Sequence, residues 1–160
     1  MIAQQDYRLI ADMMPITCVD LVLRTKEGKY LLVRRKNEPL KGEWWIPGGR
    51  VLKGETLEQA ATRKAREELG LELSSLMPLG YYEHHWKESP FGLNSGHHTV
   101  SFVFSGVVGS STIILDGQSS EWGLFPELPA GLVIVPFGEQ EPTLVGINQG
   151  VERYMNATHA

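Results

Sequence analysis

Two adjacent glutamates, Glu67 and Glu68, lie in a segment from Thr56 to Leu69 that is predicted to form a helix. At 100° per residue, Glu68 falls inside the apolar stripe of this helix, and Glu67 lies just beyond the margin of the stripe. The stripe itself is formed by Leu57, Ala61, Ala65 and Leu69, with Ala60 at its edge. An ionised carboxylate that faces the body of a protein is costly unless it is paired. A divalent cation such as Mg²⁺, which prefers oxygen ligands, offsets that cost.

An alternative interpretation is a solvated helix whose acidic groups pair with basic ones. Arg63 precedes Glu67 by four residues, and Lys64 precedes Glu68 by the same spacing. Side chains four residues apart meet on a helix surface and stabilise the helix weakly. The helix alone therefore leaves both a metal site and a set of surface ion pairs open.

The residues around the helix follow a longer pattern. Gly49 is followed after five residues by Glu55, which is followed after seven residues by Arg63. The pattern then continues with Ala65, Glu67, Glu68, Gly70 and Leu71. This spacing resembles the Nudix box. The resemblance implies an α/β fold, the Nudix α/β/α sandwich with a mixed sheet and a loop–helix–loop catalytic motif. It also implies a hydrolase in which water attacks a nucleoside diphosphate linked to another group.

By position in the box, Glu67 and Glu68 would bind the metal, which we expect to be Mg²⁺ or Mn²⁺. The backbone carbonyl of Gly49 would be a further ligand, and Glu55 with Arg63 would support the loop through a salt bridge.

One position departs from the box, because Lys64 follows the arginine where the box has a glutamate. A charged lysine neither binds a metal nor accepts a proton, and a nearby cation weakens metal binding. We therefore expect either an impaired protein or a base supplied from elsewhere in the chain.

The segments around the box look like those of GDP-mannose mannosyl hydrolase, a Nudix subfamily that also lacks this glutamate. The similarity runs from about Pro15 to Val108. In that subfamily water substitutes at the anomeric carbon of the sugar with inversion, and a metal ion stabilises the departing GDP. The resemblance implies a nucleotide-sugar substrate, GDP-mannose or GDP-glucose, that is cleaved to GDP and free sugar.

The same resemblance assigns contacts residue by residue. Asp20 matches a sugar-contacting aspartate, while Arg35 and Arg50 match diphosphate-binding arginines, of which we count Arg35 as catalytic as well. Gln118 matches a glutamine that completes the metal site. Directly after it, Ser119 stands where the subfamily has its catalytic histidine, and a serine is not a base at neutral pH. The alternatives are a surface position for Asp20 and a solvated strand end for Arg35.

Two pairs of histidines, His84 with His85 and His97 with His98, border a loop from Lys87 to Gly96 that is expected to be mobile. An unperturbed histidine has a pKa of about 6.5, which suits a general base. We predict that one of them activates water. His85 is the first choice because a subfamily histidine near this position contacts the ligand, and His98 is the second. The commoner role for any single one is a partly exposed strand end.

The elements that position these residues follow from periodicity and turn residues. Helices are predicted over Ala3 to Met13, Thr56 to Leu69 and, closing the chain, Thr143 to Met155. Strands are predicted over Ile16 to Thr25, Tyr30 to Arg35, Trp44 to Ile46, Leu71 to Leu73, Leu79 to His85, Thr99 to Val108 and Glu121 to Phe125. Hairpins and segregated helices predict a mixed sheet with helices on both faces. Four aromatic residues, Trp44, Trp45, Tyr82 and Trp86, could stack on a base or pack on the sheet.

The overall composition predicts a single globular domain over residues 1–160, with 42% hydrophobic and 21% charged residues. A net charge of −4 excludes a general nucleic-acid binder, which would carry a basic face. One cysteine, Cys18, cannot form an internal disulfide, and no apolar run reaches membrane-spanning length. We expect a cytoplasmic protein that binds a small-molecule nucleotide sugar and does not bind membranes. By resemblance alone, we expect a homodimer.

Two other functions remain open from the sequence. The first is a Nudix pyrophosphohydrolase that cleaves the phosphoanhydride of a nucleoside diphosphate derivative. The second is a non-catalytic sensor of nucleotide sugars, which Lys64 and Ser119 favour.

Overall fold

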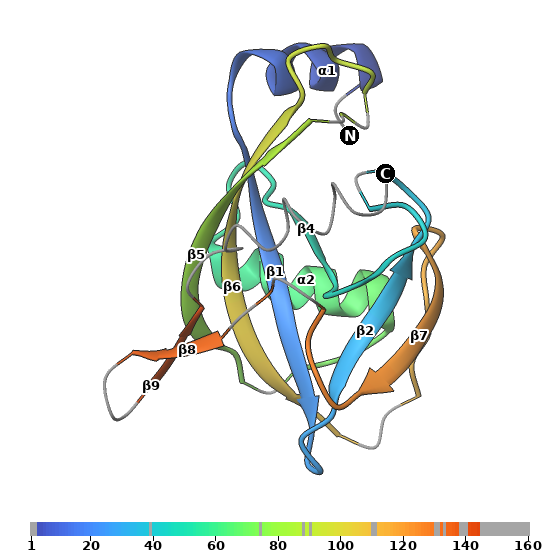
Figure 1. Cartoon of the computed structure of the whole chain (residues 1–160), viewed down its shortest axis with the longest axis vertical. Coiled ribbons are helices and arrows are strands. Elements are labelled where there is room, and N and C mark those ends of the chain that lie inside the picture. Colours follow the sequence, from blue (N-terminus) through green and yellow to red (C-terminus); the bar gives the residue numbers. More distant parts are fainter. Residues whose placement is uncertain are drawn as a thin grey trace.

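The structure is a computed structural model of the 160-residue chain (Figure 1). It describes residues 3–38, 40–73, 75–87, 89, 91–109, 112–129, 132, 134–137 and 141–144. In chain order the elements are α1 (Gln4–Met13), β1 (Ile16–Thr25), β2 (Tyr30–Arg35), β3 (Trp44–Trp45), β4 (Gly48–Arg50), α2 (Leu57–Leu69), β5 (Met77–Trp86), β6 (His97–Val108), β7 (Ser119–Phe125), β8 (Ile134–Phe137) and β9 (Glu141–Leu144). Within these ranges, neither helix is long and apolar enough to cross a membrane.

Seven strands of the described part of the chain form one mixed sheet, in which β3, β2, β1, β6 and β5 follow one another. β1 and β6 run parallel, whereas β5 and β6 are antiparallel. β1 and β2 pair beside their connecting turn, at Arg24 and Tyr30, and then diverge (Figure 1). At the other end of β1, Cys18 and Asp20 pair with Arg50 and Gly48 of β4. The sheet is thus split between β1 and β2, and β4 occupies the split.

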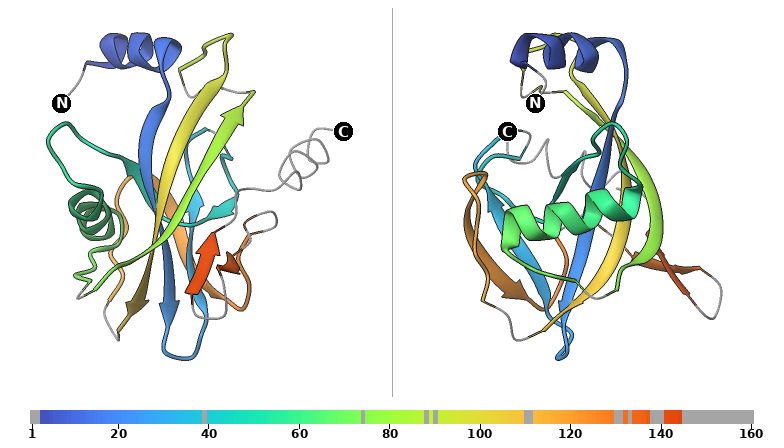
Figure 2. Two further views of the ribbon diagram at one scale, coloured as in Figure 1. Left: turned by 90° about the vertical axis from the view of Figure 1, so that its left-hand side faces the viewer. Right: turned by 180° about the vertical axis from the view of Figure 1, so that it is seen from behind.

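The two faces of the sheet have different partners. α2 lies across one face (Figure 2), where its alanines pack against Val19, Leu21 and Leu23 of β1. The opposite face carries a second apolar cluster that includes Val22 and Tyr82. Because side chains alternate across a strand, Cys18 and Asp20 lie on the same face as Val22. α1 covers the end of this second face, where Tyr7 and Ala11 pack with Ile16.

The ends of α2 are fixed by its sequence. The Thr56 hydroxyl accepts a hydrogen bond from the backbone N–H of Gln59, and the Gln59 side chain accepts one from the backbone N–H of Thr56. This reciprocal pair satisfies two donors that the first turn leaves unpaired. At the other end Gly70 adopts the left-handed conformation, with φ of 67°, which glycine reaches without steric cost.

The mixed α/β fold, the first two helices and most strands are confirmed. The strand expected over Leu71 to Leu73 is wrong, because this stretch has no regular secondary structure and its leucines pack in the apolar cluster beneath α2. The closing helix was expected to begin at Thr143, but Thr143 and Leu144 belong to β9. The rest of that predicted helix lies outside the described residues.

Candidate active site

The loop before α2 is built on two glycines that allow close approach. A side chain on Gly48 would collide with the Asp20 carboxylate and with the Val19 carbonyl. A Cβ on Gly49 would lie 2.7 Å from Cε of Lys64. The absence of side chains at these two positions lets β4 lie directly between β1 and α2.

A bidentate ion pair holds this loop to α2. The Arg63 guanidinium contacts both carboxylate oxygens of Glu55, at 2.5 Å and 2.9 Å, and also donates to the carbonyl of Arg50 at 2.9 Å. Glu55 in turn accepts a hydrogen bond from the backbone N–H of Leu52. The hydrogen bonds from Arg63 and Leu52 hold the pKa of Glu55 well below its usual value, at about 2. Arg63 and Glu55 thus form the supporting salt bridge that the sequence predicts.

The two glutamates of α2 have different surroundings. Glu68 is 5% exposed, whereas the Glu67 side chain is 48% exposed. One oxygen of Glu68 accepts a hydrogen bond from the backbone N–H of Gly48 at 3.1 Å. Burial raises the pKa of Glu68 above its usual value, and the nearby negative charge of Asp116 acts in the same direction. Glu68 therefore lies where the helical periodicity predicts, facing the body of the protein.

Lys64 lies between these glutamates. Its ammonium is 2.7 Å from Oε1 of Glu68 and 3.5 Å from Oε2 of Glu67, and the residue is only 6% exposed. Its side chain also lies against the Gly49 backbone. The ion pair offsets part of the cost of burying both charges, and the Lys64 ammonium opposes the rise in the pKa of Glu68. The ammonium is thus a positive charge held between two residues that the Nudix box assigns to the metal.

The segment after β6 brings two more polar residues to the end of α2. The backbone N–H of Asp116 lies 3.4 Å from the carbonyl oxygen of Glu68. The Gln118 side chain donates to the Asp116 carboxylate at 3.0 Å, and the Gln118 carbonyl accepts from the backbone N–H of Lys36. Gln118 is therefore placed between the end of β2 and the end of α2. The sequence analysis did not predict a role for Asp116. Its position, two residues before the expected ligand Gln118, could have indicated one.

On the other side of β4, Asp20 is a buried carboxylate with its own hydrogen-bond donors. The Tyr82 hydroxyl donates to Oδ2 of Asp20, and the Ser101 side chain also bonds to this carboxylate. Burial raises the pKa of Asp20, and these two hydrogen bonds act against that rise. Asp20 therefore has polar partners, as a buried carboxylate requires. Tyr82 packs in the second apolar cluster, as expected, and its hydroxyl is in addition a hydrogen-bond donor to Asp20.

Arg35 links the two carboxylates electrostatically. Burial lowers the pKa of its guanidinium, while the negative charges of Asp20 and then Glu68 act in the opposite direction. The residue lies at the end of β2, next to the irregularity in its pairing with β7. Arg35 therefore lies within the field of both Asp20 and Glu68, and it is not a fully solvated strand end.

Arg50 lies on the α1 side of the same region. Its guanidinium carbon is 4.0 Å from the centre of the Tyr7 ring, a cation–π contact. Arg50 pairs with Cys18 across β4 and β1, and burial raises the pKa of that thiol to about 12. Cys18 is therefore a protonated, inert residue between Asp20 and α1.

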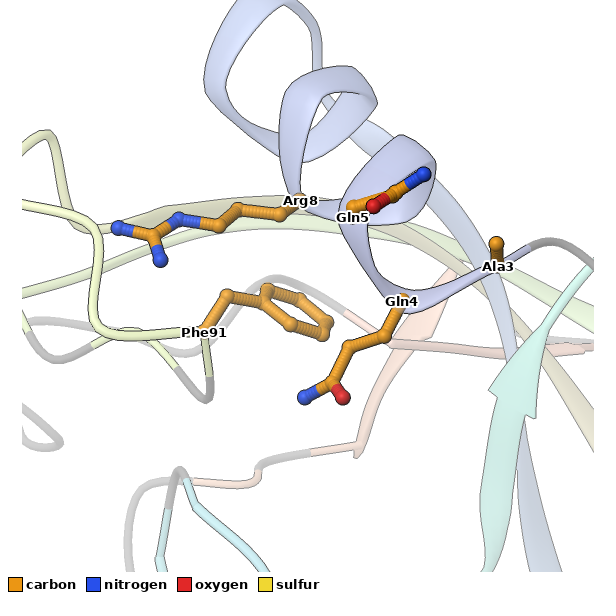
Figure 3. Close-up of a pocket in the computed structure, with 5 residues that line it drawn as sticks. All are labelled: Ala3, Gln4, Gln5, Arg8 and Phe91. Carbon is orange, nitrogen blue, oxygen red and sulfur yellow. The ribbon is translucent and has the colours of Figure 1, made fainter.

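A hollow of about 520 Å³ adjoins this part of the site. Phe91, Arg8 and Gln4 form its wall, together with Ala3 and Gln5 (Figure 3). The Phe91 ring in turn makes an edge contact with Tyr7, whose ring carries the Arg50 guanidinium. The Phe91 and Tyr7 rings therefore lie between the hollow and the Arg50 guanidinium. A second hollow, of about 340 Å³, lies away from the glutamates, beside Trp44, Phe125 and Leu128.

The four histidines divide between the two faces of the β5–β6 hairpin. His84 is buried on the Tyr82 side and stacks on Trp86 with ring centres 3.5 Å apart. His97 is buried on that side too, beside Phe91. His85 and His98 pair across the strands and stack on each other at 4.0 Å. Since residues alternate along a strand, these two point away from Asp20 and Tyr82.

The structure thus brings together most of the predicted site, from β1, β2, β4, α2 and the 112–118 segment. Asp20, Arg35, Gly49, Glu68 and Gln118 converge around the split in the sheet. It does not bring His85 and His98 to the face of Asp20. Alternation of side chains along a strand was the sequence signal that places adjacent histidines, such as His84 and His85, on opposite faces.

Comparison with known proteins gives the family. The model of the NUDIX domain matches residues 14–133 of the chain. The chain belongs to the Nudix family. Its fold is also that of the MutT NUDIX hydrolase from Burkholderia pseudomallei, with a TM-score of 0.63 and 27% identity over 75% of this chain and 91% of that one. The NUDIX domain of Shewanella oneidensis NrtR, complexed with ADP ribose, shares the fold at a TM-score of 0.59 and 20% identity, covering 99% and 98%.

Two relatives match this chain over different shares of their length. The low-salt glycan biosynthesis protein Agl8 of Haloferax volcanii is 35% identical over 157 residues, which cover 98% of this Nudix chain and 90% of the relative. The ADP-ribose pyrophosphatase of Methanocaldococcus jannaschii is 41% identical over 90 residues, covering 56% and 49%. The first similarity extends along the whole chain, whereas the second is limited to about half of each protein.

The donor set of the Nudix site fits a divalent metal ion. Glu68 is a buried carboxylate with burial and Asp116 both opposing its charge, so a cation there is stabilising. By position in the Nudix pattern, Glu67, Gln118 and the Gly49 carbonyl would add oxygen donors of the kind that Mg²⁺ prefers. The ammonium of Lys64, between Glu67 and Glu68, already shows that this position attracts positive charge. Because lysine has a long flexible stem, its ammonium can leave the two carboxylates when a metal ion enters.

Proposed function

We propose that this Nudix hydrolase cleaves a nucleoside diphosphate sugar and releases the nucleoside diphosphate and the free sugar. The observation that supports this most directly is Asp20, a buried carboxylate oriented by Tyr82 and coupled to Arg35. A carboxylate beside a diphosphate-binding arginine can accept hydrogen bonds from sugar hydroxyls. Cleavage of a simple phosphoanhydride does not require such an acceptor.

The two arginines hold the diphosphate in this proposal. A guanidinium presents several donors in one plane and matches phosphate oxygens well. Arg35 lies within the field of the Asp20 and Glu68 carboxylates, and Arg50 is held on the Tyr7 ring. A diphosphate that bridges Arg35 and Arg50 places its sugar next to Asp20. Arg35 also stabilises the charge that develops on the departing diphosphate, which is its catalytic contribution.

Glu67, Glu68, the Gly49 carbonyl and Gln118 would hold Mg²⁺, or Mn²⁺ in its place. The metal, when bound, neutralises the departing diphosphate and so lowers the barrier for substitution at the sugar carbon. Asp116 supports this site by accepting the Gln118 side-chain amide. Glu55 and Arg63 contribute indirectly, because they hold the loop that carries Gly49.

The sugar is proposed to be mannose or glucose linked to GDP. Two lines support a sugar nucleotide: the match of Asp20, Arg35 and Arg50 to the mannosyl hydrolase pattern, and the full-length similarity to a glycan biosynthesis protein. The relative's description concerns glycans, and a nucleotide sugar is the usual activated form from which glycans are made.

A second candidate is a pyrophosphohydrolase, which the similarity to the archaeal ADP-ribose pyrophosphatase favours. The two candidates give different products from the same substrate. We expect GDP and free sugar from GDP-mannose or GDP-glucose with Mg²⁺, resolved by chromatography and ¹⁸O-water labelling. The label enters the sugar in our proposal, whereas GMP and a sugar phosphate would contradict it and support the second candidate.

A third candidate, a nucleotide-sugar sensor, is favoured by the buried pair of Lys64 and Glu68. Glu68→Gln distinguishes a catalytic metal from a purely structural ion pair. We expect this variant to lose turnover and Mg²⁺ binding while its thermal unfolding stays cooperative. Binding of GDP-mannose by the parent without any turnover would support the sensor and contradict a hydrolase.

A further inference from the structure

A second group of potential metal ligands lies outside the Nudix site, on the β5–β6 hairpin. Glu83, His85 and His98 each offer one ligand atom, and these three atoms lie within 4.8 Å of one another. Among the described residues, it is the group of three His, Cys, Asp or Glu side chains that meets this spacing. Two imidazoles and one carboxylate are ligands of the kind that Zn²⁺ and related transition-metal ions take.

The strand register explains why these three side chains meet. His85 pairs directly with His98, and Glu83 lies two residues before His85 on the same face of β5. The histidine rings stack with centres 4.0 Å apart and an angle of 26° between their planes. Tyr81 and Phe102 contact each other further along the same face. The group is therefore set by the pairing of two strands and bordered on one side by aromatic residues.

One nitrogen of this group makes no hydrogen bond to the described residues. The Nε2 atom of His98 is buried and has no hydrogen-bond partner within the described structure. A buried polar atom without a partner costs free energy, and most such atoms in proteins are satisfied. Glu83 and His85 are exposed, so an ion can reach the group from solvent and their side chains can adjust.

We propose that Glu83, His85 and His98 form a binding site for a transition-metal dication of the Zn²⁺ class, separate from the Nudix metal site. In a tetrahedral zinc site with bonds of about 2.0–2.1 Å, the donor atoms lie about 3.4 Å apart. The ligand atoms here lie within 4.8 Å of one another, and rotation of the exposed Glu83 and His85 side chains can bring them to this shorter separation. Three protein ligands leave a fourth position for water. The ion fastens β5, at the edge of the sheet, to β6.

The test is Zn²⁺ titration calorimetry in excess Mg²⁺, which occupies the Nudix site and leaves the hairpin group for zinc. The titration uses a His159→Gln background, so that the remaining histidine of the chain does not contribute. We expect one Zn²⁺ per chain, with affinity reduced tenfold or more by His85→Gln and by His98→Gln. Glu83→Gln should weaken binding as well, because it removes the carboxylate.

The matched controls are His84→Gln and Glu68→Gln. His84 lies on the same strand but on the opposite face, and Glu68 belongs to the Nudix site. Zinc affinity within twofold of the parent is expected for both. Unchanged affinity in His85→Gln and His98→Gln, or loss in Glu68→Gln, overturns the proposal.

A measurement on the parent alone gives a second check, in which Zn²⁺ shifts the imidazole resonances of His85 and His98. Shifts at His84 or His97 instead also overturn it.

Discussion

The ammonium of Lys64 lies 2.7 Å from Oε1 of Glu68, and both side chains are almost fully buried. This ion pair joins the residue that departs from the Nudix box to the residue that the box assigns to the metal. The lysine also contacts the half-exposed Glu67. We therefore expect this side chain to compete with a metal ion for the carboxylates that the Nudix box assigns to the metal.

This competition predicts that Lys64→Gln raises the affinity for Mg²⁺. Removing the charge leaves Glu68 buried without its partner, a change that typically destabilises a protein by about 3–5 kcal/mol. A bound metal ion replaces the lost charge, so Mg²⁺ should raise the melting temperature of Lys64→Gln more than that of the parent. We expect the Mg²⁺ affinity from calorimetry to increase tenfold or more.

Lys53→Gln is the control for this prediction, since Lys53 is an exposed lysine on the preceding loop. It should leave both the Mg²⁺ affinity and the metal-dependent stabilisation unchanged. Equal Mg²⁺ affinity in Lys64→Gln and the parent would mean that the ammonium and the metal do not share a site.

The diphosphate clamp is tested by Arg35→Ala and Arg50→Ala. Each substitution removes a charge-assisted hydrogen bond to phosphate, worth about 1–3 kcal/mol, or roughly fivefold to 150-fold in kcat/KM. Arg35→Ala should lower kcat as well, because Arg35 also stabilises the departing diphosphate. Arg34→Ala is the control, since Arg34 pairs with Glu121 on the neighbouring strand. Steady-state kinetics within twofold of the parent for both variants would refute the clamp.

The Glu55–Arg63 pair predicts a specific dependence of stability on pH. The pKa of Glu55 is lowered from 4.5 to about 2 in the folded chain. A carboxylate with a lowered folded pKa stabilises the fold above its unfolded pKa, and this contribution is lost as the pH falls. The contribution of Glu55 should therefore decline between about pH 4.5 and pH 2. Urea unfolding of Glu55→Gln should show a flatter dependence in that range, whereas substitution of the exposed Glu38 should not.

Local chemistry made part of this structure predictable. Thr56 and Gly70 are a cap and a stop whose effects act within one turn of helix, so the limits of α2 follow from sequence. Glu68 was predictable for the same reason, because helical periodicity decides which face a residue takes. Leu71 and Leu73 show the limit, since an apolar stretch can pack beneath a helix as well as join a sheet.

Contacts between distant segments were harder to predict. Tyr82 of β5 reaches Asp20 of β1 because both strands pair with β6, one on each side of it. The pairing of β1 with β6 is parallel, and no local feature of the sequence predicts it. Asp116 reaches Glu68 through the segment after β6, again over a long stretch of chain. The resemblance to the Nudix box assigned the expected metal ligands, but it carried no information on the position of the Lys64 ammonium.

The last prediction concerns the base, which the sequence placed at His85 or His98. Both point away from Asp20, whereas His84 shares the face of Tyr82 and lies about 7 Å further along the strand. Burial lowers the pKa of His84 to about 4, so its imidazole is neutral at pH 7 and can accept a proton. Its Nδ1 atom is buried without a hydrogen-bond partner in the described structure. We therefore expect His84→Gln to lower kcat about 10²-fold, the usual scale for a general base.

The pH profile distinguishes a base from a packing residue, since His84 also stacks on Trp86. If His84 is the base, kcat of the parent falls as the pH drops through about 4, and His84→Gln loses this acidic limb. A packing defect would lower kcat at every pH and leave the limb in place. His85→Gln and His98→Gln, assayed with Mg²⁺ and a chelator selective for zinc, should keep near-parental kcat. A 10²-fold loss of kcat in either of these two variants, with parental kcat in His84→Gln, would show that the base is His85 or His98 instead.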